Sequence, residues 1–266
     1  MTSLLEVRPG SRIASLPAAL KPIALLLRLI YLGLQNILRK LTGGALLSDY
    51  PHRSDRMATK SIVGFQDDER FRHAYQRAVV AGGWDFGIPY RVHQALWCSR
   101  NAQKVEGDFV ELGTGRGFIM SAVLQDFEGW RESERRIYLF DTFEQGWVER
   151  GDRGAKSPYY AETVEATRAN FSEWERVSIV QGDVRKVLQD QPISKIAFLH
   201  VDLNHADTEV WAIRELWPRL SQGGLMLLDD FANLGREEQH DSLILLAKEL
   251  DFEVLYTASG QGIVIK

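Results

Sequence analysis

A glycine-rich turn between two apolar segments constrains the fold of this chain more than any other feature. The segment Phe109–Leu112 runs directly into Gly113–Gly117, in which every second residue is glycine, and a second apolar segment, Ile137–Phe140, is followed by Asp141. A strand, a glycine turn and a helix let the backbone approach a nucleotide-like ligand, and a carboxylate after the next strand can accept hydrogen bonds from ribose hydroxyls. The pattern therefore predicts an α/β domain with a ligand site at the turn.

From Phe109 onward, apolar segments alternate with segments of helical spacing. The expected strands are 109–112, 137–140, 177–180, 196–201 and 225–228, and the expected helices are 119–127, 161–171, 184–188, 208–220 and 236–250. Apolar strands separated by helices indicate a parallel sheet covered on both faces. The last two segments, 252–256 and 263–265, are joined by a connection so short that they should form an antiparallel hairpin. We therefore expect a doubly wound, mostly parallel, seven-stranded Rossmann-like α/β sheet, preceded by helices between 67 and 100.

Basic and acidic residues are unevenly distributed along the chain. Residues 1–60 contain nine Lys/Arg and three Asp/Glu, whereas the remaining residues contain 23 Lys/Arg and 33 Asp/Glu. We accordingly divide the chain into a basic N-terminal arm, residues 1–60, and a folded domain, residues 61–266. An acidic domain is a poor nucleic-acid binder, because affinity for nucleic acid comes mostly from neutralised phosphates. The single cysteine, Cys98, excludes an internal disulfide and fits a reducing, cytoplasmic location.

The basic arm contains an expected amphipathic helix, residues 22–42, followed by a polar linker. Pro22 suits the first turn of this helix, and Gly43 and Gly44 suit its end. Its apolar run is interrupted by Arg28 and is shorter than the roughly 20 residues that span a bilayer. Two interpretations remain open. The helix packs on the domain or on a second subunit of a homo-oligomer, or it lies peripherally on the inner face of an anionic membrane.

Two classes of cofactor compete for the glycine turn. A dinucleotide site prefers G-x-G-x-x-G, whereas Gly113–Gly117 has the spacing G-x-G-x-G. Glu111 stands two residues before the turn, where its carboxylate would repel a pyrophosphate but attract the ammonium and sulfonium groups of S-adenosylmethionine. Asp141 is then expected to bind the ribose diol and Asp183 to lie near the adenine edge; alternatively, both acids cap the turn or helix that follows them. The order of these acids along three strand ends favours S-adenosylmethionine.

Acidic side chains also follow the fourth and fifth expected strands. Asp202 comes directly after 196–201, and Asp229 and Asp230 come directly after 225–228. In a sheet ordered 3-2-1-4-5 these two strands are neighbours, roughly 4.8 Å apart, so the three carboxylates share one rim. They would repel each other unless a cation neutralises them, and oxygen ligands without cysteine suit Mg²⁺. We expect a magnesium site here; the alternative is that these acids cap helices or order loops.

Several segments of this chain resemble the macrocin O-methyltransferase family, which has the class I methyltransferase fold and methylates hydroxyls of sugars in natural products and surface glycans. The matching segments, in chain order, are 107–113, 138–144, 200–204, 216–220, 223–230 and 260–266, and the resemblance covers roughly Phe65 to Lys266. The resemblance implies a metal-dependent enzyme that uses S-adenosylmethionine. The residues expected at the donor site are Glu111, Gly113, Thr114, Gly115, Gly117, Asp141, Thr142 and Asp183.

The resemblance implies that Asp202, Asp229 and Asp230 bind the metal and that Asp202 is also the base. His205 is an alternative base beside the expected metal. A sugar hydroxyl ionises too weakly at neutral pH to react unaided, and a divalent cation stabilises its alkoxide. The chain departs from the family at Asn204, where the antibiotic-tailoring enzymes usually have a second acid. We still expect a metal despite this departure, but the resemblance does not imply the identity of the acceptor.

We therefore expect a Mg²⁺-assisted O-methyltransferase that acts on a sugar hydroxyl of a glycan or a glycosylated natural product. Two alternatives belong to other classes of protein. One is a catalytically silent scaffold that binds the donor, and the other is a membrane-associated assembly factor that acts through its basic arm. Three mutually repelling acids argue against a silent protein, because such a protein has little reason to keep them. The sequence identifies neither the acceptor, nor the position methylated, nor the oligomeric state.

Overall fold

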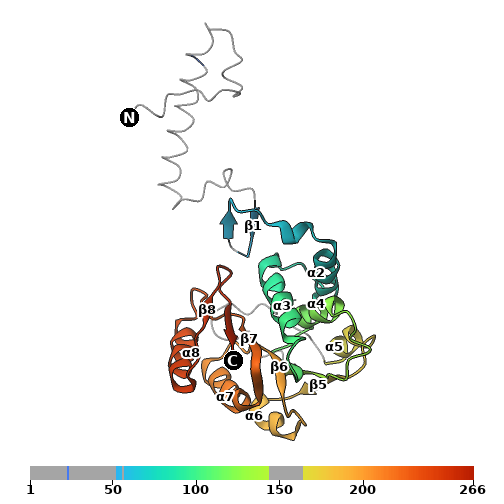
Figure 1. Ribbon diagram of the computed structural model, residues 1–266, viewed down its shortest axis with the longest axis vertical. Coiled ribbons are helices and arrows are strands. Elements are labelled where there is room, and N and C mark those ends of the chain that lie inside the picture. Colours follow the sequence, from blue (N-terminus) through green and yellow to red (C-terminus); the bar gives the residue numbers. More distant parts are fainter. Residues whose placement is uncertain (1–22, 24–51, 56, 144–163) are drawn as a thin grey trace. The chain divides into compact units, whose positions relative to one another are not determined.

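The structure is a computed structural model of the chain and describes residues 23, 52–55, 57–143 and 164–266. Residues 53–57 and 61–266 form one compact unit (Figure 1). The expected arm helix, residues 22–42, lies outside the described residues apart from Ile23, so the interpretations of that helix remain predictions. Among the residues described, none of the helices has the length and apolar character needed to cross a membrane.

A seven-stranded sheet forms the centre of this unit (Figure 1). Its strands are β3 (Asp108–Leu112), β4 (Ile137–Asp141), β5 (Val177–Gln181), β6 (Ile196–Val201), β7 (Leu220–Leu228), β8 (Leu255–Tyr256) and β9 (Gly262–Ile265). Their order is β5-β4-β3-β6-β7-β9-β8, with β3 to β7 parallel and β9 antiparallel to both β7 and β8. This confirms the predicted parallel sheet, the 3-2-1-4-5 order and the antiparallel C-terminal pair.

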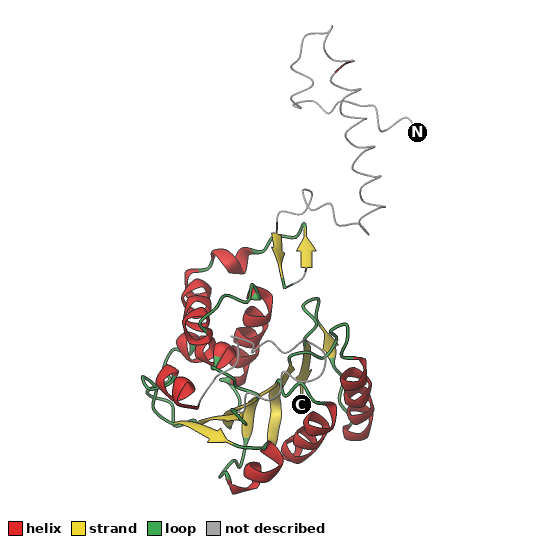
Figure 2. Ribbon diagram, turned by 180° about the vertical axis from the view of Figure 1, so that it is seen from behind, coloured by secondary structure: helices red, strands yellow, loops and turns green. Residues whose placement is uncertain are grey.

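Helices cover both faces of the sheet (Figure 2). They are α2 (Glu69–Gly82), α3 (Pro89–Ala102), α4 (Phe118–Asp126), α5 (Val164–Asn170), α6 (Val184–Val187), α7 (Ala206–Leu216) and α8 (Glu237–Leu250). The predicted helix 208–220 ends early: Pro218 lies in a 3₁₀ turn, Trp217–Arg219, and β7 begins directly after it. A proline ring lacks the N–H that an α-helix would need at that point. The strand predicted over 252–256 is also shorter than expected, because only Leu255–Tyr256 pairs with β9.

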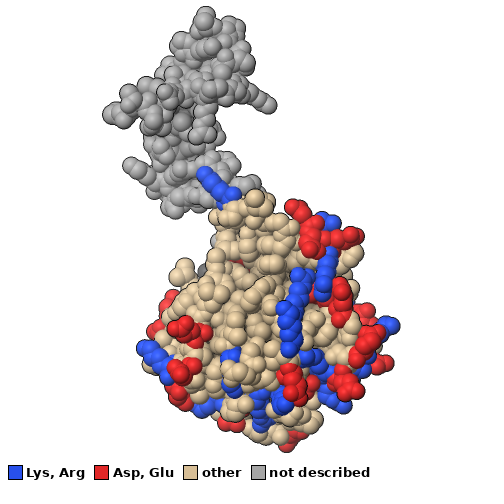
Figure 3. Space-filling model, viewed as in Figure 1, with Lys and Arg blue, Asp and Glu red and all other residues tan. Residues whose placement is uncertain are grey.

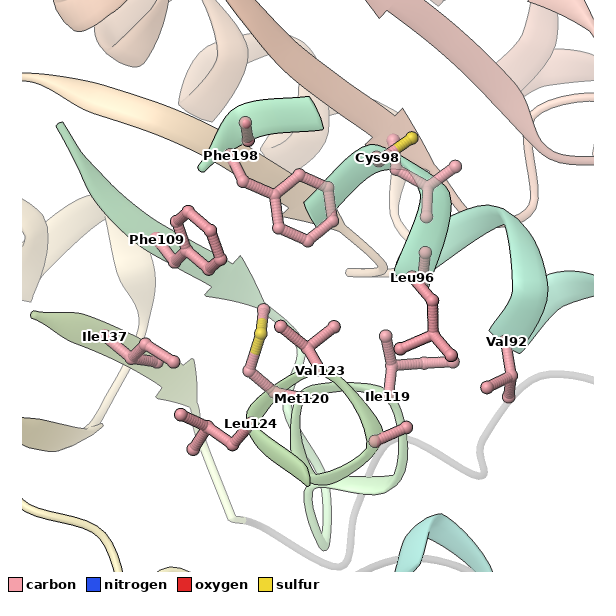
Figure 4. Close-up of a cluster of buried hydrophobic side chains, with 14 of the residues drawn as sticks. Val92, Leu96, Cys98, Phe109, Ile119, Met120, Val123, Leu124, Ile137 and Phe198 are labelled. Carbon is pink, nitrogen blue, oxygen red and sulfur yellow. The ribbon is translucent and has the colours of Figure 1, made fainter. Parts of the chain in front are cut away.

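Alternation along each strand divides the core between the two faces. Phe109 and Phe198 point to the face covered by α2, α3 and α4, where Cys98, Met120 and their neighbours complete a buried cluster (Figure 4). The intervening residues of the same strands, such as Val110 and Leu199, point to the face covered by α6, α7 and α8. Strands buried on both faces explain why the sequence shows continuous apolar runs rather than alternation.

The segment expected to be a polar linker contains structure of its own. β1 (His52–Ser54) and β2 (Met57–Thr59) form a two-stranded sheet. Between them, Asp55 is 6% exposed, and its carboxylate accepts hydrogen bonds from the backbone N–H groups of Tyr90 at 2.9 Å and Arg91 at 3.0 Å. These amides belong to the first turn of α3, where intrahelical acceptors are lacking. Asp55 therefore caps α3 from a distant part of the chain and helps to orient Arg91.

Candidate active site

The register of the sheet brings the glycine turn and the acidic residues to one rim. Leu112, Val201 and Leu228 lie side by side at the ends of β3, β6 and β7. The next residues continue this pairing: the Asp202 N–H donates to the Leu112 carbonyl at 2.8 Å, and the Asp229 N–H donates to the Val201 carbonyl at 3.0 Å. The backbone itself thus places the expected donor turn next to the expected metal ligands.

Gly113 forms the closest point of this contact. Its φ angle is +88°, and a Cβ atom at this position would lie 1.9 Å from the Asp202 carbonyl oxygen. Only glycine adopts this left-handed conformation readily and also lacks the Cβ atom for which there is no space. Gly115 and Gly117 also have positive φ angles, and Gly117 begins α4. The turn therefore needs its first glycine for packing against Asp202, which the sequence pattern alone did not reveal.

Asp202, Asp229 and Asp230 form an acidic cluster, as predicted from their positions. Each contributes a carboxylate oxygen, and these oxygens lie within 4.8 Å of one another. Asp229 is 8% exposed, and Asp202 and Asp230 are half-buried. Burial, followed by the charges of Asp229 and Asp230, raises the pKa of Asp202 well above its usual range. The ionised form of Asp202 is therefore unfavourable beside Asp229 and Asp230 unless a positive partner offsets the repulsion.

Arg91 supplies positive charge to the acidic cluster. Its Nη1 atom donates to Asp229 Oδ2 at 2.5 Å and to Asp230 Oδ1 at 3.1 Å. Arg236 adds a longer ion pair to Asp230 Oδ2, at 3.6 Å. Arg91 thus reaches the acidic cluster from α3, whereas His93 of the same helix stacks on Phe65 with ring centroids 4.1 Å apart.

Amide side chains also donate hydrogen bonds to the carboxylates of the cluster. Gln261, which is fully buried, donates to Asp229 Oδ1 at 2.7 Å. Asn204 donates to Asp202 Oδ1 at 2.8 Å, and Asn233 donates to Asp230 Oδ1. Asn204 is the residue at which the chain departs from the antibiotic-tailoring enzymes, and in this structure it orients an expected metal ligand. His205 lies at the start of α7, with its Nδ1 atom 3.2 Å from the Thr208 hydroxyl.

The donor-site acids have local partners in the structure. Asp141 accepts hydrogen bonds from the Gly115 N–H at 2.7 Å and the Phe143 N–H at 2.8 Å. Asp183 caps α6 through the Arg185 N–H at 3.0 Å and pairs with the Arg185 guanidinium. Both therefore perform the capping roles that we considered as alternatives. These roles leave ribose or adenine contacts open, because a carboxylate accepts several hydrogen bonds.

Glu111 is 2% exposed and pairs with His200, which is 1% exposed; Oε1 of Glu111 lies 2.9 Å from Nδ1 of His200. Burial opposes the protonated imidazole, but the hydrogen bond and the negative charge of Glu111 outweigh it and raise the pKa of His200. Glu111 Oε2 and the Thr114 hydroxyl are buried without a hydrogen-bond partner among the described residues. Unpaired buried polar atoms at the glycine turn fit a bound donor, since such groups are normally satisfied.

The acidic cluster also fits a hard divalent cation. Magnesium takes oxygen ligands at about 2.1 Å, so the ligands of one ion lie roughly 3 to 4 Å apart. The oxygens of the three carboxylates lie within 4.8 Å, and small side-chain movements would bring them into one coordination shell. Among the described residues, the ligand set consists of carboxylates and includes no cysteine or histidine. Ligands that are all oxygen atoms favour magnesium over softer metals.

Sequence reasoning missed the residues that support the cluster from other elements. These residues are Arg91 in its observed role, Glu209, Arg236 and Gln239. No local pattern distinguishes them, because each reaches the site through a long-range contact.

The sequence of this chain is similar to a family model and to two curated proteins. Residues 110–231 match the family model of a methyltransferase domain. A tetracenomycin rhamnosyl 4'-O-methyltransferase from Streptomyces olivaceus is 31% identical over 53% of this chain and 59% of its own length. A demethyldecarbamoylnovobiocin O-methyltransferase from Streptomyces niveus is 26% identical over 48% of this chain and 53% of its own length. The chain thus spans only between half and three fifths of these curated relatives.

A solved structure supports the fold assignment. The O-methyltransferase NovP superposes with a TM-score of 0.56 over 72% of this chain and 88% of that chain, at 21% sequence identity. The order β5-β4-β3-β6-β7-β9-β8, with its antiparallel C-terminal pair, is the arrangement expected of class I methyltransferases. The chain therefore has the class I methyltransferase fold, and residues 110–231 match a methyltransferase domain, which agrees with the resemblance to the macrocin O-methyltransferases.

Proposed function

We propose that this domain transfers a methyl group from S-adenosylmethionine to a hydroxyl of a sugar, carried on a glycan or a glycosylated natural product. The observation that carries the proposal is the contact between Gly113 and the Asp202 carbonyl. It joins the donor turn to the acidic cluster, so a methyl donor and an acceptor hydroxyl held by the two would meet directly. Both curated relatives are named as O-methyltransferases, and the name of the first gives a rhamnosyl tetracenomycin as its substrate, which supports the proposed substrate class.

The donor would be held by the residues of the glycine turn and the strand ends around it. Thr114 and Glu111 offer the unpaired atoms described above, and Asp141 stands at the end of the neighbouring strand. Glu111 carries the charge that favours a sulfonium over a diphosphate. The same charge argues against a dinucleotide cofactor in this turn.

Asp202, Asp229 and Asp230 would hold Mg²⁺. A bound magnesium ion would supply Lewis acidity, which lowers the pKa of a sugar hydroxyl. In the transfer itself, the acceptor oxygen forms a bond to the methyl carbon while the carbon–sulfur bond breaks and S-adenosylhomocysteine is released. The hydroxyl proton passes to a base. Asp202 is the proposed base because it adjoins the donor turn, and His205 at the start of α7 is the alternative.

The acceptor is best sought with radiolabelled S-adenosylmethionine and a panel of nucleotide sugars, lipid-linked saccharides and cell-envelope extracts. Each reaction is run with EDTA and again after magnesium is restored. We expect label in a saccharide only when magnesium is present. Label that appears equally in EDTA would contradict the metal, and donor binding without transfer to any acceptor would support the catalytically silent scaffold instead.

Membrane contact through residues 22–42 and homo-oligomerisation remain separate proposals. Flotation of the full chain with anionic vesicles, compared with a chain that begins at His52 and so keeps Asp55, tests the membrane contact. Loss of binding on truncation is the result we expect if the arm lies on a membrane. Sedimentation of the same two chains tests whether the arm instead joins subunits.

A further inference from the structure

The turn that carries Asp202 is held by a residue that has no part in the proposed chemistry. Glu209 lies in α7, and one of its oxygens, Oε1, accepts hydrogen bonds from the backbone N–H groups of Leu203 and Asn204, both at 3.0 Å. Its other oxygen accepts from the Gln239 side chain of α8 at 2.8 Å. The carboxylate thus connects the β6–α7 turn to two helices.

This arrangement differs from an ordinary helix cap. In a capping box, a glutamate at the third helical position bonds the N–H of the capping residue. Glu209 is the fourth residue of α7, whose capping residue is His205, and it bonds the two residues before that cap. At 1% exposure, Glu209 is almost completely withdrawn from water. Burying a carboxylate costs free energy unless hydrogen bonds replace those with water, and Glu209 accepts three of them.

The geometry that Glu209 fixes leads to the Asp202 carboxylate. Asn204 has a φ angle of +58°, a left-handed conformation that is uncommon outside glycine. This conformation aims its backbone N–H at Glu209, while its side chain donates to Asp202 Oδ1 at 2.8 Å. The Asn204 amide oxygen in turn accepts from Arg236. The amide group is therefore held at both ends, and its direction depends on the strained backbone.

We infer that Glu209 is a positioning residue that holds the Asp202 carboxylate in its working orientation through the Leu203–Asn204 backbone. The inference rests on the proposed function, in which Asp202 receives the acceptor proton. Without Glu209, the half-buried N–H groups of Leu203 and Asn204 lose their acceptor, and the left-handed conformation of Asn204 loses a stabilising hydrogen bond. Asp202 would then sample orientations that do not meet the acceptor.

The test compares Glu209→Ala and Glu209→Gln with Glu215→Ala as control. Glu215 lies in the same helix, and its carboxylate accepts an exposed hydrogen bond from Gln189 at 2.8 Å. Amide hydrogen exchange at Leu203 and Asn204, donor affinity and turnover are measured for each variant. In Glu209→Ala, we expect faster exchange at both amides, unchanged donor affinity and a fall in kcat of about 100-fold, the cost of a misplacement of about 1 Å.

Glu209→Gln separates positioning from charge. Its carbonyl oxygen can accept both backbone N–H groups, and Gln239 can turn its amide to accept from the new side chain. We expect this variant to keep the slow amide exchange and most of the turnover, and we expect Glu215→Ala to match the wild type. A general loss of structure would weaken donor binding as well, so unchanged donor affinity identifies a local effect.

Two results would overturn the inference while the wild type remains active. One is unchanged exchange at Leu203 and Asn204 in Glu209→Ala, and the other is faster exchange with unchanged kcat. Failure of the proposed function is distinguishable, because it would appear as a wild-type protein that binds donor and methylates no acceptor. That result would remove both the proposed function and the role of Glu209 in it.

Discussion

Arg91 and Asp229 form an ion pair of 2.5 Å between α3 and the end of β7, and each side chain is only 11–12% exposed. The same guanidinium nitrogen lies 3.1 Å from Asp230. An arginine from one face of the sheet thus offsets the repulsion among carboxylates at its rim. On the face shown in Figure 3, basic and acidic side chains lie near one another at several places. The pair of Arg91 and Asp229 differs from such exposed charges because both of its side chains are nearly buried.

Replacing Arg91 by methionine should destabilise the protein most when no divalent cation is present. Breaking one partner of a buried ion pair typically costs about 3 to 5 kcal/mol, because the remaining charge is left uncompensated. We expect a lower Tm in EDTA and a larger rise in Tm on adding Mg²⁺ than in the wild type. Thermal unfolding checks this, with Arg214→Met as control because its pair with Glu249 is exposed. Equal Tm values in EDTA for Arg91→Met and wild type would contradict the role of Arg91.

Asp202→Asn should abolish methyl transfer while leaving donor affinity within a few-fold of the wild type. The amide keeps the size of the side chain but cannot accept the acceptor proton, and general-base removal typically costs about 10² to 10⁴ in rate. Single-turnover assays with labelled donor, together with calorimetric donor binding, separate the two effects. Asp207→Asn, at an exposed position in the same turn region, is the matched control. Undiminished turnover in Asp202→Asn would show that another group is the base.

Gly113→Ala and Gly115→Ala should differ sharply although both lie in one turn. At Gly113 the new methyl would meet the Asp202 carbonyl at 1.9 Å, whereas at Gly115 no atom lies within 4 Å. Both positions have positive φ angles, so each variant carries a backbone cost of about 1 kcal/mol. Only Gly113→Ala must also separate β3 from β6. Chemical denaturation should therefore show a loss several times larger for Gly113→Ala, and equal losses would refute the close contact.

Glu209 should make stability depend on pH near neutrality. Burial raises the pKa of Glu209 to about 7, against an ordinary value of 4.5, although its hydrogen bonds with Leu203 and Asn204 oppose the rise. Because the folded state holds this proton more tightly than the unfolded chain, its contribution is complete below about pH 4.5 and is lost as the pH rises through about 7.

Denaturation of wild type and Glu209→Gln in EDTA measures this contribution, since glutamine does not titrate. The free energy of unfolding of wild type relative to the variant should fall by at most about 3 kcal/mol as the pH rises from about 4.5 to about 7. Parallel stability curves for the two proteins across this range would contradict the raised pKa.

Cys98 should be inert in the folded protein. The side chain is fully buried in the cluster of α3, α4 and the sheet (Figure 4), and burial raises the pKa of its thiol to about 12. Thiolates, not thiols, react with disulfide reagents. A colorimetric thiol titration should find no reactive cysteine in native protein and one per chain after denaturation with guanidinium. Rapid labelling of the native protein would show that this part of the core opens.

The order and type of the elements could be predicted because they depend on local periodicity. The apolar runs at 137–140 and 196–201 indicated buried parallel strands, and the structure places strands there. Acids directly after β6 and β7 were expected to share a rim, and Asp202 and Asp229 do so because parallel strands end at the same edge. The ends of the elements were harder to predict. At Pro218 the chain forms a 3₁₀ turn rather than a further turn of α-helix, and this depends on the strand that follows.

By itself, the sequence determined the alternating architecture, the glycine turn and the places of acids directly after two strands, since each follows from a short segment and from the period of a helix or strand. Only the tertiary structure decided which side chains complete the site. Arg91 lies 138 residues from Asp229, and Gln239 lies 30 residues from Glu209. Such pairs form because separate elements pack at particular angles and depths. The free energy of that packing is shared among many contacts and is not encoded in any one local pattern.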